Sequence, residues 1–189
     1  MTASLLSTDG NDQINGTVVP DFFDALMGDD IVFGGGGSDV IFGNEGNDTL
    51  YADTYAGYAG ADVATDWNVL LGGNGDDALV SGVGQDDLWG GAGNDIMTGG
   101  ASVDWFVFEP GSGIDTITDF TPGEDSIMVM ANMNGTGDPT LSQNDFGTVV
   151  DFGGGNAVVL AGVEMSSLPT DAIQVLPYTD LSSFYSLVG

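Results

Sequence analysis

The sequence contains no lysine, arginine, histidine or cysteine, while 29 aspartate and glutamate residues give it a formal net charge of −29. Without cationic side chains no internal ion pair to a Lys or Arg can form. Every carboxylate must therefore be solvated, protonated or matched by an ion from outside. Nucleic acid is excluded as a partner, because binding it needs Lys or Arg contacts to phosphate. An anionic membrane surface is disfavoured for the same reason.

The missing residue types also restrict the chemistry of the protein. Without Cys there is no disulfide framework, and without Cys and His a zinc site is disfavoured. The absence of His, Cys and Lys removes the catalytic triad, the thiol nucleophile and the Schiff base, so we expect no enzyme. A carboxylate pair could hydrolyse glycosides, but the repeat described below uses nearly every Asp. No apolar run is long enough to span a membrane, and the N-terminus lacks the pattern of a cleaved signal peptide.

High acidity alone is compatible with a disordered chain or a halophilic surface. Disordered chains have few apolar residues, whereas 42% of this sequence is hydrophobic. Halophilic adaptation stays open as an alternative, but it would not place an Asp at every ninth position.

Residues 72–107 consist of four nine-residue units without a gap, GGNGDDALV, SGVGQDDLW, GGAGNDIMT and GGASVDWFV. Each unit has Asp at position six and a large apolar residue at position eight, and Gly fills most of positions one, two and four. The glycine-rich half requires backbone angles that side chains forbid, which predicts a tight turn. The second half alternates polar and apolar residues, which predicts a short strand with one inward side chain.

The same register covers residues 7–51, 63–71, 110–118 and 120–128, which makes twelve units in all. An insertion over residues 52–62, rich in Tyr, Ala and Gly, interrupts it and is either a contact surface or a plain surface loop. Position six holds Asn68 in one unit. In the other eleven it is Asp12, Asp21, Asp30, Asp39, Asp48, Asp77, Asp86, Asp95, Asp104, Asp115 and Asp125. Position eight is always apolar.

Such a short and strict period is typical of a solenoid, in which no unit can bury its apolar residue alone. Two units make one coil of about eighteen residues, and stacked coils form two parallel sheets around the position-eight side chains. We therefore predict an all-β fold, a right-handed parallel β-roll over residues 1–128. Residues 129–189 should form a β-rich C-terminal cap, with strands at 140–146, 148–152, 157–160 and 173–176 and a hairpin at 153–156.

Stacking brings the position-six carboxylates onto the edges of the coils. Adjacent rungs lie about 4.7–4.9 Å apart, so two carboxylates repel by roughly 3–4 kcal/mol at an effective dielectric constant near 20. Such a ladder closes only with cations between the rungs, and hard oxygen ligands select Ca²⁺. We expect several Ca²⁺ ions, and a disordered chain in their absence.

The consensus G-G-x-G-x-D-x-U-x, in which U is a large apolar residue, resembles the calcium-binding nonapeptide of the RTX (repeats-in-toxin) proteins, the hemolysin-type calcium-binding family. Residues 105–127 are similar to the segment that follows the repeats in RTX proteases and lipases, although the zinc-binding HExxH motif of the proteases is absent. The tail 181–189 looks similar to the uncleaved C-terminal signal of RTX proteins. The resemblance implies a secreted protein, extracellular or at the cell surface, with the type I secretion apparatus as a partner.

The resemblance also implies the ligand sets. In the family each ion lies between two turns that are two units apart, bound by the Asp of both turns and by backbone carbonyls. Carried onto this sequence, the pairs are Gly73, Gly75 and Asp77 with Gly90, Ala92 and Asp95; Gly82, Gly84 and Asp86 with Gly99, Ala101 and Asp104; Leu26, Gly28 and Asp30 with Gly43, Glu45 and Asp48; and Thr17, Val19 and Asp21 with Gly34, Gly36 and Asp39. Asp29, Asp76 and Asp87, beside the motif positions, are expected to be solvated turn residues.

Three functions remain open at this point. The first is a secreted structural protein that folds on Ca²⁺ and assembles into a homo-oligomer or filament, as a matrix or surface layer. The second is an adhesin-like or carbohydrate-binding module that uses the insertion and the C-terminal region. The third is the export and folding module of a larger RTX protein.

Overall fold

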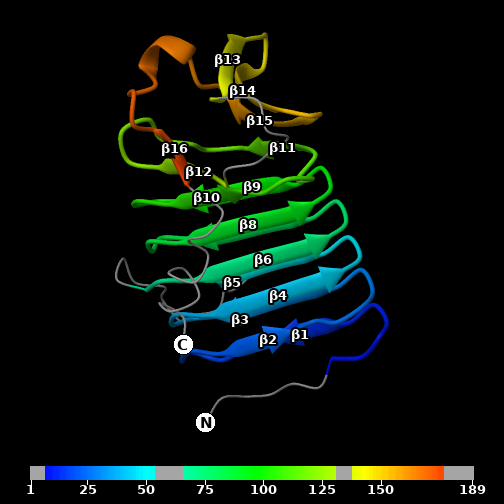
Figure 1. Ribbon diagram of the computed structural model, residues 1–189. Helices are drawn as coiled ribbons and strands as arrows, with labels where there is room; N and C mark the ends of the chain where they lie inside the picture. The colour runs from blue at the N-terminus through cyan, green and yellow to red at the C-terminus, as the bar shows by residue number, and fades with distance from the viewer. Residues whose placement is uncertain (1–6, 54–65, 131–137, 177–189) are drawn as a thin grey trace.

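The predicted short strands form a regular stack in the computed structural model, which describes residues 7–53, 66–130 and 138–176 (Figure 1). Successive strands alternate between two sheets. The nine-stranded sheet has the order β1 (Gln13–Asn15), β3 (Ile31–Gly35), β5 (Thr49–Asp53), β7 (Ala78–Gly82), β9 (Ile96–Gly100), β11 (Ile114–Ile117), β15 (Asn156–Ala161), β14 (Gly147–Gly153) and β13 (Thr140–Gln143). The seven-stranded sheet has the order β16 (Ile173–Leu176), β12 (Ser126–Met130), β10 (Trp105–Phe108), β8 (Asp87–Ala92), β6 (Val69–Asn74), β4 (Val40–Glu45) and β2 (Phe22–Asp24).

Strand register confirms the nine-residue period. β1 to β12 pair in parallel with their neighbours two strands away, and Gln13 lies opposite Ile31 just as Phe22 lies opposite Val40. Beyond the insertion the pairing continues in phase, with Thr49 opposite Ala78. The strands on either side of the insertion therefore keep the same side chains facing inward, as a period-two strand requires.

The core lies between the two sheets, and the position-eight side chains form its continuous rows. All twelve are buried, as predicted from the pattern: Ile14, Phe23, Val32, Ile41, Leu50, Leu70, Leu79, Leu88, Met97, Phe106, Ile117 and Ile127. Each coil contributes only two of them. Burial of apolar surface, the main stabilising contribution in a fold, is thus spread evenly along the stack.

Two predicted boundaries differ from the structure. Ala52 and Asp53, which belong to the predicted insertion, continue strand β5, and Ala52 is buried because it is a small apolar residue facing the core. The remaining insertion residues 54–62 lie outside the described residues. The strand predicted at 140–146 ends at Gln143, because Asn144 Oδ1 accepts the N–H groups of Phe146 and Gly147 and so fixes a turn.

The C-terminal region continues both sheets. The predicted hairpin is present, with β14 antiparallel to β15, and β15 in turn pairs in parallel with β11. The predicted strand at 173–176 is β16, which pairs in parallel with β12. Leu160 and Ile173 thereby extend the two rows of core residues by one coil. The division at residue 128 stays a prediction, since neither sheet breaks there. The described part of the chain has a single short 3₁₀ helix, η1 (Met165–Ser167), and no helix in it could cross a membrane.

Candidate metal centre

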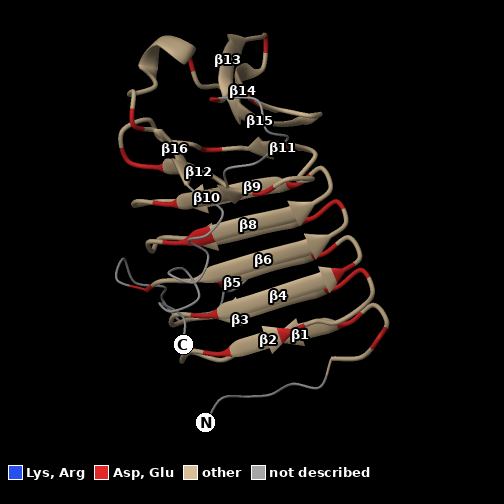
Figure 2. Ribbon diagram, viewed as in Figure 1, with Lys and Arg blue, Asp and Glu red and all other residues tan. Residues whose placement is uncertain are grey.

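The position-six residues form two continuous ladders, one along each edge of the stack. In the first ladder the backbone N–H of each residue donates to the Oδ1 atom of the next, at 2.7–2.9 Å; its members are Asp12, Asp30, Asp48, Asp77, Asp95 and Asp115. In the second ladder the same bonds measure 2.8–3.1 Å; its members are Asp21, Asp39, Asn68, Asp86, Asp104 and Asp125. Figure 2 shows acidic residues in the turns on both edges of the stack, and no basic residue anywhere.

Burial makes the charged form of these carboxyl groups costly. Asp48, Asp77, Asp95 and Asp104 are at most 2% exposed. Burial raises the pKa of Asp77 and Asp104 to about 7, and that of Asp48 and Asp95 to about 6. Nearby carboxylates raise each pKa further, while the backbone N–H bonds oppose the shift. A buried carboxylate of this kind needs a positive partner, and the chain has no side chain that could provide one.

The second oxygen of the carboxylate is the observation that points to a metal. The Oδ2 atoms of Asp30, Asp48, Asp77, Asp95 and Asp104 are buried and have no hydrogen-bond partner. Backbone oxygen lies close to them. A Cβ atom built on Gly72 would lie 2.3 Å from Asp77 Oδ2 and 2.4 Å from the carbonyl oxygen of Gly90. Position one is thus a space lined by oxygen atoms, which a side chain would fill.

The same arrangement recurs along the stack. A Cβ on Gly43 would lie 2.3 Å from Asp48 Oδ2 and 2.5 Å from the carbonyl oxygen of Gly72. Carboxylate and carbonyl oxygens are the ligands that Ca²⁺ prefers, so the residues present fit this ion. When bound, Ca²⁺ supplies the positive charge that the sequence lacks. The position-six Asp of adjacent coils and the carbonyl groups of their turns would hold it.

The structure brings together all four pairs of turns that the resemblance implied. The Asp residues of each pair are joined in the ladders, and the turns themselves are joined by backbone bonds. Gly75 N–H donates to the Ala92 carbonyl at 2.9 Å, and Ala101 N–H donates to the Gly82 carbonyl at 2.8 Å. The remaining two pairs are joined likewise, by Gly28 N–H to Glu45 O at 2.8 Å and by Gly36 N–H to Thr17 O at 2.9 Å.

The predicted ligands near the ends of the stack have different surroundings. Asp12 Oδ2 accepts the N–H and the hydroxyl of Thr8, and Asp21 Oδ2 accepts the same two groups of Thr17. Asp125 Oδ2 accepts the N–H of Thr121 at 2.7 Å. Each Thr occupies position two, where the central units have Gly. This substitution is a signal in the sequence that could have separated the terminal carboxylates from the central ones.

Sequence reasoning also missed a third ladder, in which each position-five side chain accepts the backbone N–H of the next rung. It joins Asn11, Asp29, Asn47, Asp76 and Asn94 at 2.7–3.2 Å. Asp29 and Asp76 are therefore more than solvated turn residues. Asp87 likewise has a partner, because Trp67 Nε1 donates to its Oδ2 atom at 3.1 Å. Amides and carboxylates alternate along this ladder, which keeps like charges off adjacent rungs.

Within residues 7–53, 66–130 and 138–176 no three acidic side chains converge on one point. Side chains alone therefore do not complete a metal site there. The remaining ligands must come from the backbone of the turns, as the resemblance implied for Gly73, Gly75, Gly90 and Ala92.

Comparison with known proteins agrees with this geometry. The family described as RTX calcium-binding nonapeptide repeat (4 copies) matches residues 6–41, 24–54 and 68–106. No curated protein matches the chain. Among solved structures, the extracellular lipase LipA from Serratia marcescens is 20% identical with a TM-score of 0.49, and the comparison covers 90% of this chain but only 39% of the lipase. The AlgE6R3 subunit of the Azotobacter vinelandii mannuronan C5-epimerase is 22% identical with a TM-score of 0.30, covering 91% of this chain and 82% of that one.

The matched repeats, the two sheets of parallel strands and the buried Asp ladders agree on one identity. The chain is a Ca²⁺-binding β-roll protein that carries RTX calcium-binding nonapeptide repeats at residues 6–41, 24–54 and 68–106.

Proposed function

We propose that this protein is a secreted structural protein, which folds when it meets Ca²⁺ outside the cell and then assembles with further copies of itself. The observation that carries the proposal is the row of buried carboxylates whose Oδ2 atoms lack a hydrogen-bond partner. Where free Ca²⁺ is scarce, repulsion along both ladders keeps the chain open and exportable. Where Ca²⁺ is abundant, ion binding and folding occur together.

A structural role is favoured over a catalytic one by the residues available. The sequence offers no His, Cys or Lys, and the buried carboxylates are engaged in the ladders. The function would then lie in the stack itself, as part of a matrix, surface layer or filament.

Self-assembly is supported by the surface of the roll. Among the described residues, strands β1 and β2 each pair with one strand in their sheets, so their outer edges can pair with another chain. Large apolar side chains are exposed on the outer faces, among them Phe22, Ile31, Ile96 and Ile114 at 41–56%. Copies with such high negative charge repel one another, and Ca²⁺ between them would offset that repulsion.

Calcium titration with two simultaneous readouts tests both halves of the proposal. Circular dichroism should show a change from disordered to β-structure as Ca²⁺ is added, and light scattering should then show growth into large particles. EDTA should reverse both. Full β-structure in EDTA at neutral pH would contradict coupled folding, whereas a folded chain that stays monomeric would contradict assembly and favour an adhesin-like or export module.

A further inference from the structure

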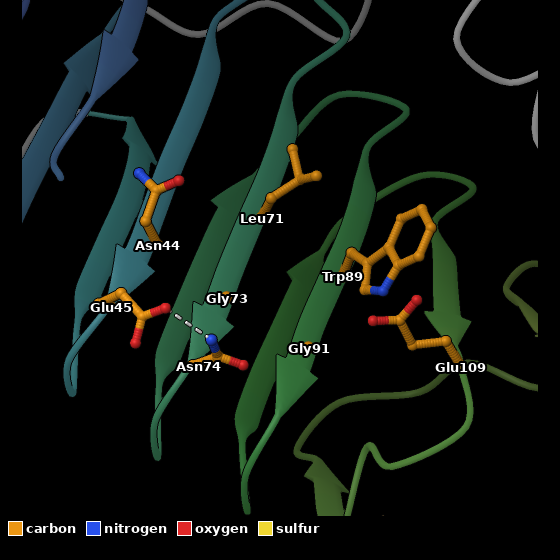
Figure 3. Close-up of a pocket in the computed structure, with 8 residues that line it drawn as sticks. All are labelled: Asn44, Glu45, Leu71, Gly73, Asn74, Trp89, Gly91 and Glu109. Atoms are coloured by element: carbon orange, nitrogen blue, oxygen red, sulfur yellow. Dashed lines mark hydrogen bonds between the residues drawn. The ribbon is translucent and has the colours of Figure 1, made fainter. Parts of the chain in front are cut away.

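A groove on the outer face of the seven-stranded sheet takes no part in the Asp ladders. It encloses about 290 Å³ and lies over the ends of β4, β6, β8 and β10. Figure 3 shows its lining side chains spread over these neighbouring strands, with Asn44 and Glu45 at one end and Trp89 and Glu109 at the other. Four rungs at about 4.8 Å spacing make it about 14 Å long.

The floor of the groove is made of glycine. Gly73 lies opposite Asn44 and Gly91 in the strand register, and all three occupy position two of their units. Both glycines have positive φ angles, +117° and +99°, and a Cβ on either would lie 2.1 Å from the carbonyl oxygen of the preceding rung. Side chains are therefore excluded from the floor, and the space above it stays open.

The two walls differ in chemistry. One wall is apolar, formed by Leu71 and Trp89, and Trp89 packs against the buried cluster of Val107, Met128 and Met130. The opposite wall is polar, formed by Glu45 and Asn74, whose side chains are joined by a 2.8 Å hydrogen bond from Asn74 Nδ2 to Glu45 Oε1. Glu109 lies at the Trp89 end, and Asn44 lies at the other end, donating to Asp24 Oδ1 at 2.9 Å.

We propose that this groove binds a neutral, linear polysaccharide. A pyranose ring has an apolar face of C–H groups, which suits the flat indole of Trp89, and a rim of hydroxyl groups, which suits carboxylate and amide oxygens. Each wall is formed by two residues that lie opposite one another on neighbouring strands, Leu71 with Trp89 and Glu45 with Asn74, so the groove runs across the strands and the complementary ligand is an extended chain. Its volume accommodates a short stretch of such a chain, at the small end of the usual range for ligand pockets.

The negative charge of the groove favours neutral polysaccharides over anionic ones. The groove has carboxylates at both ends and the whole chain has no cationic side chain, so uronate and sulfate groups would be repelled. A hard cation in the groove is disfavoured by the apolar wall, which offers no oxygen ligand. The site goes beyond the proposed structural function, since it needs the folded roll but neither assembly nor secretion.

The test is isothermal titration of the full calcium-loaded chain with neutral tetrasaccharides of glucose, mannose and N-acetylglucosamine, with tetragalacturonate as the anionic counterpart. At least one neutral sugar should bind, and tetragalacturonate should bind at least tenfold more weakly. Trp89→Ala should weaken binding at least tenfold, because the stacking face is lost. Trp105→Ala, on the neighbouring strand but outside the groove, should leave binding unchanged.

Two further variants distinguish the loss of a sugar contact from a folding defect. Glu109→Gln keeps the shape of the side chain and should alter affinity severalfold, and Trp89→Phe keeps an aromatic face and should bind better than Trp89→Ala. Circular dichroism and calcium content are measured for each. The proposal is overturned if no neutral sugar binds, if Trp105→Ala weakens binding as much as Trp89→Ala, or if Glu109→Gln lowers the calcium content with no effect on sugar binding.

Discussion

At the scale of single residues, the two oxygens of each central Asp have different tasks. Asp77 Oδ1 accepts the N–H of Asp48 at 2.7 Å, which ties one rung to the next, while Oδ2 is buried without a partner. The uncharged Asn68 also ties one rung to the next, since its Oδ1 atom accepts the N–H of Asp39 at 2.8 Å. The bond between rungs therefore needs only an oxygen, and the negative charge serves the ion.

Replacing Asp77 by Asn should separate these tasks. We expect the variant to need at least about tenfold more Ca²⁺ for folding, about 1.4 kcal/mol, because one charged ligand is lost. In EDTA the same variant should keep its β-structure to a higher pH than the wild type, since a buried charge is removed and the Oδ1 bond is kept. Calcium titration and pH titration in EDTA, both followed by circular dichroism, measure the two effects.

Asp76→Asn is the matched control, because Asp76 is the exposed neighbour in the position-five ladder, where Asn occurs naturally. Its calcium midpoint should equal that of the wild type. Equal midpoints for Asp77→Asn and the wild type would mean that the ladder carboxylates do not bind the ion.

At the scale of elements, the turns restrict which side chains they can accommodate as strictly as the strands do. Gly72 has an ordinary backbone conformation, yet a side chain there would lie 2.3 Å from Asp77 Oδ2. The constraint is therefore steric, and it concerns the same space that the ion needs.

Gly72→Ala should destabilise the calcium-loaded roll by about 1–3 kcal/mol through overpacking and should also weaken calcium binding. Gly10→Ala is the control, since the nearest atom to its Cβ would be 4.0 Å away. Urea unfolding at saturating Ca²⁺ gives the comparison. A Gly72→Ala variant as stable as Gly10→Ala would show that position one is not packed as described.

The C-terminal strands provide a second prediction at this scale. Leu160 on β15 is fully buried and continues the core row of Ile117, whereas Leu141 on β13 is 42% exposed. Leu160→Ala should cost about 2–5 kcal/mol, and Leu141→Ala should stay within about 0.5 kcal/mol of the wild type. Similar losses from both variants, measured by urea unfolding in Ca²⁺, would contradict a core shared between the roll and its C-terminal region.

At the scale of the whole molecule, stability depends on how the ladder carboxylates are neutralised. Burial raises the pKa of Asp77 and Asp104 to about 7 and that of Asp115 to about 8, whereas an unfolded Asp has a pKa of about 3.9. The folded chain without metal therefore binds more protons than the unfolded chain. By linkage, its stability is fully present below about pH 4 and is lost as the pH rises through the folded pKa values.

We therefore expect the β-structure of the chain in EDTA to be lost steadily as the pH rises from about 5 to about 8. With Ca²⁺ the trend should reverse, because protons compete with the ion for the same carboxylates. Circular dichroism at low protein concentration measures the β-structure and avoids precipitation near the isoelectric point of about 4.1. A β-structure content in EDTA that is constant or rises with pH would contradict the burial of these groups in a metal-free fold.

The sequence by itself determined the period, the two-sheet roll, the row of core residues and the choice of Ca²⁺. A strict repeat of nine residues leaves each side chain one possible direction, and a chain without cations leaves its carboxylates no partner of their own. The strand at 173–176 and the hairpin at 153–156 followed from the same local patterns.

Only the tertiary structure decided which rungs meet across the insertion, which carboxylates keep an oxygen without a partner, and where the groove lies. These depend on residues far apart in the chain. Thr8 and Thr17 hydrogen-bond the terminal carboxylates, and the groove joins Asn44 to Glu109 across four rungs. The continuation of both sheets by β15 and β16 was also beyond local patterns, because a strand's sequence shows that it pairs but not with which neighbour.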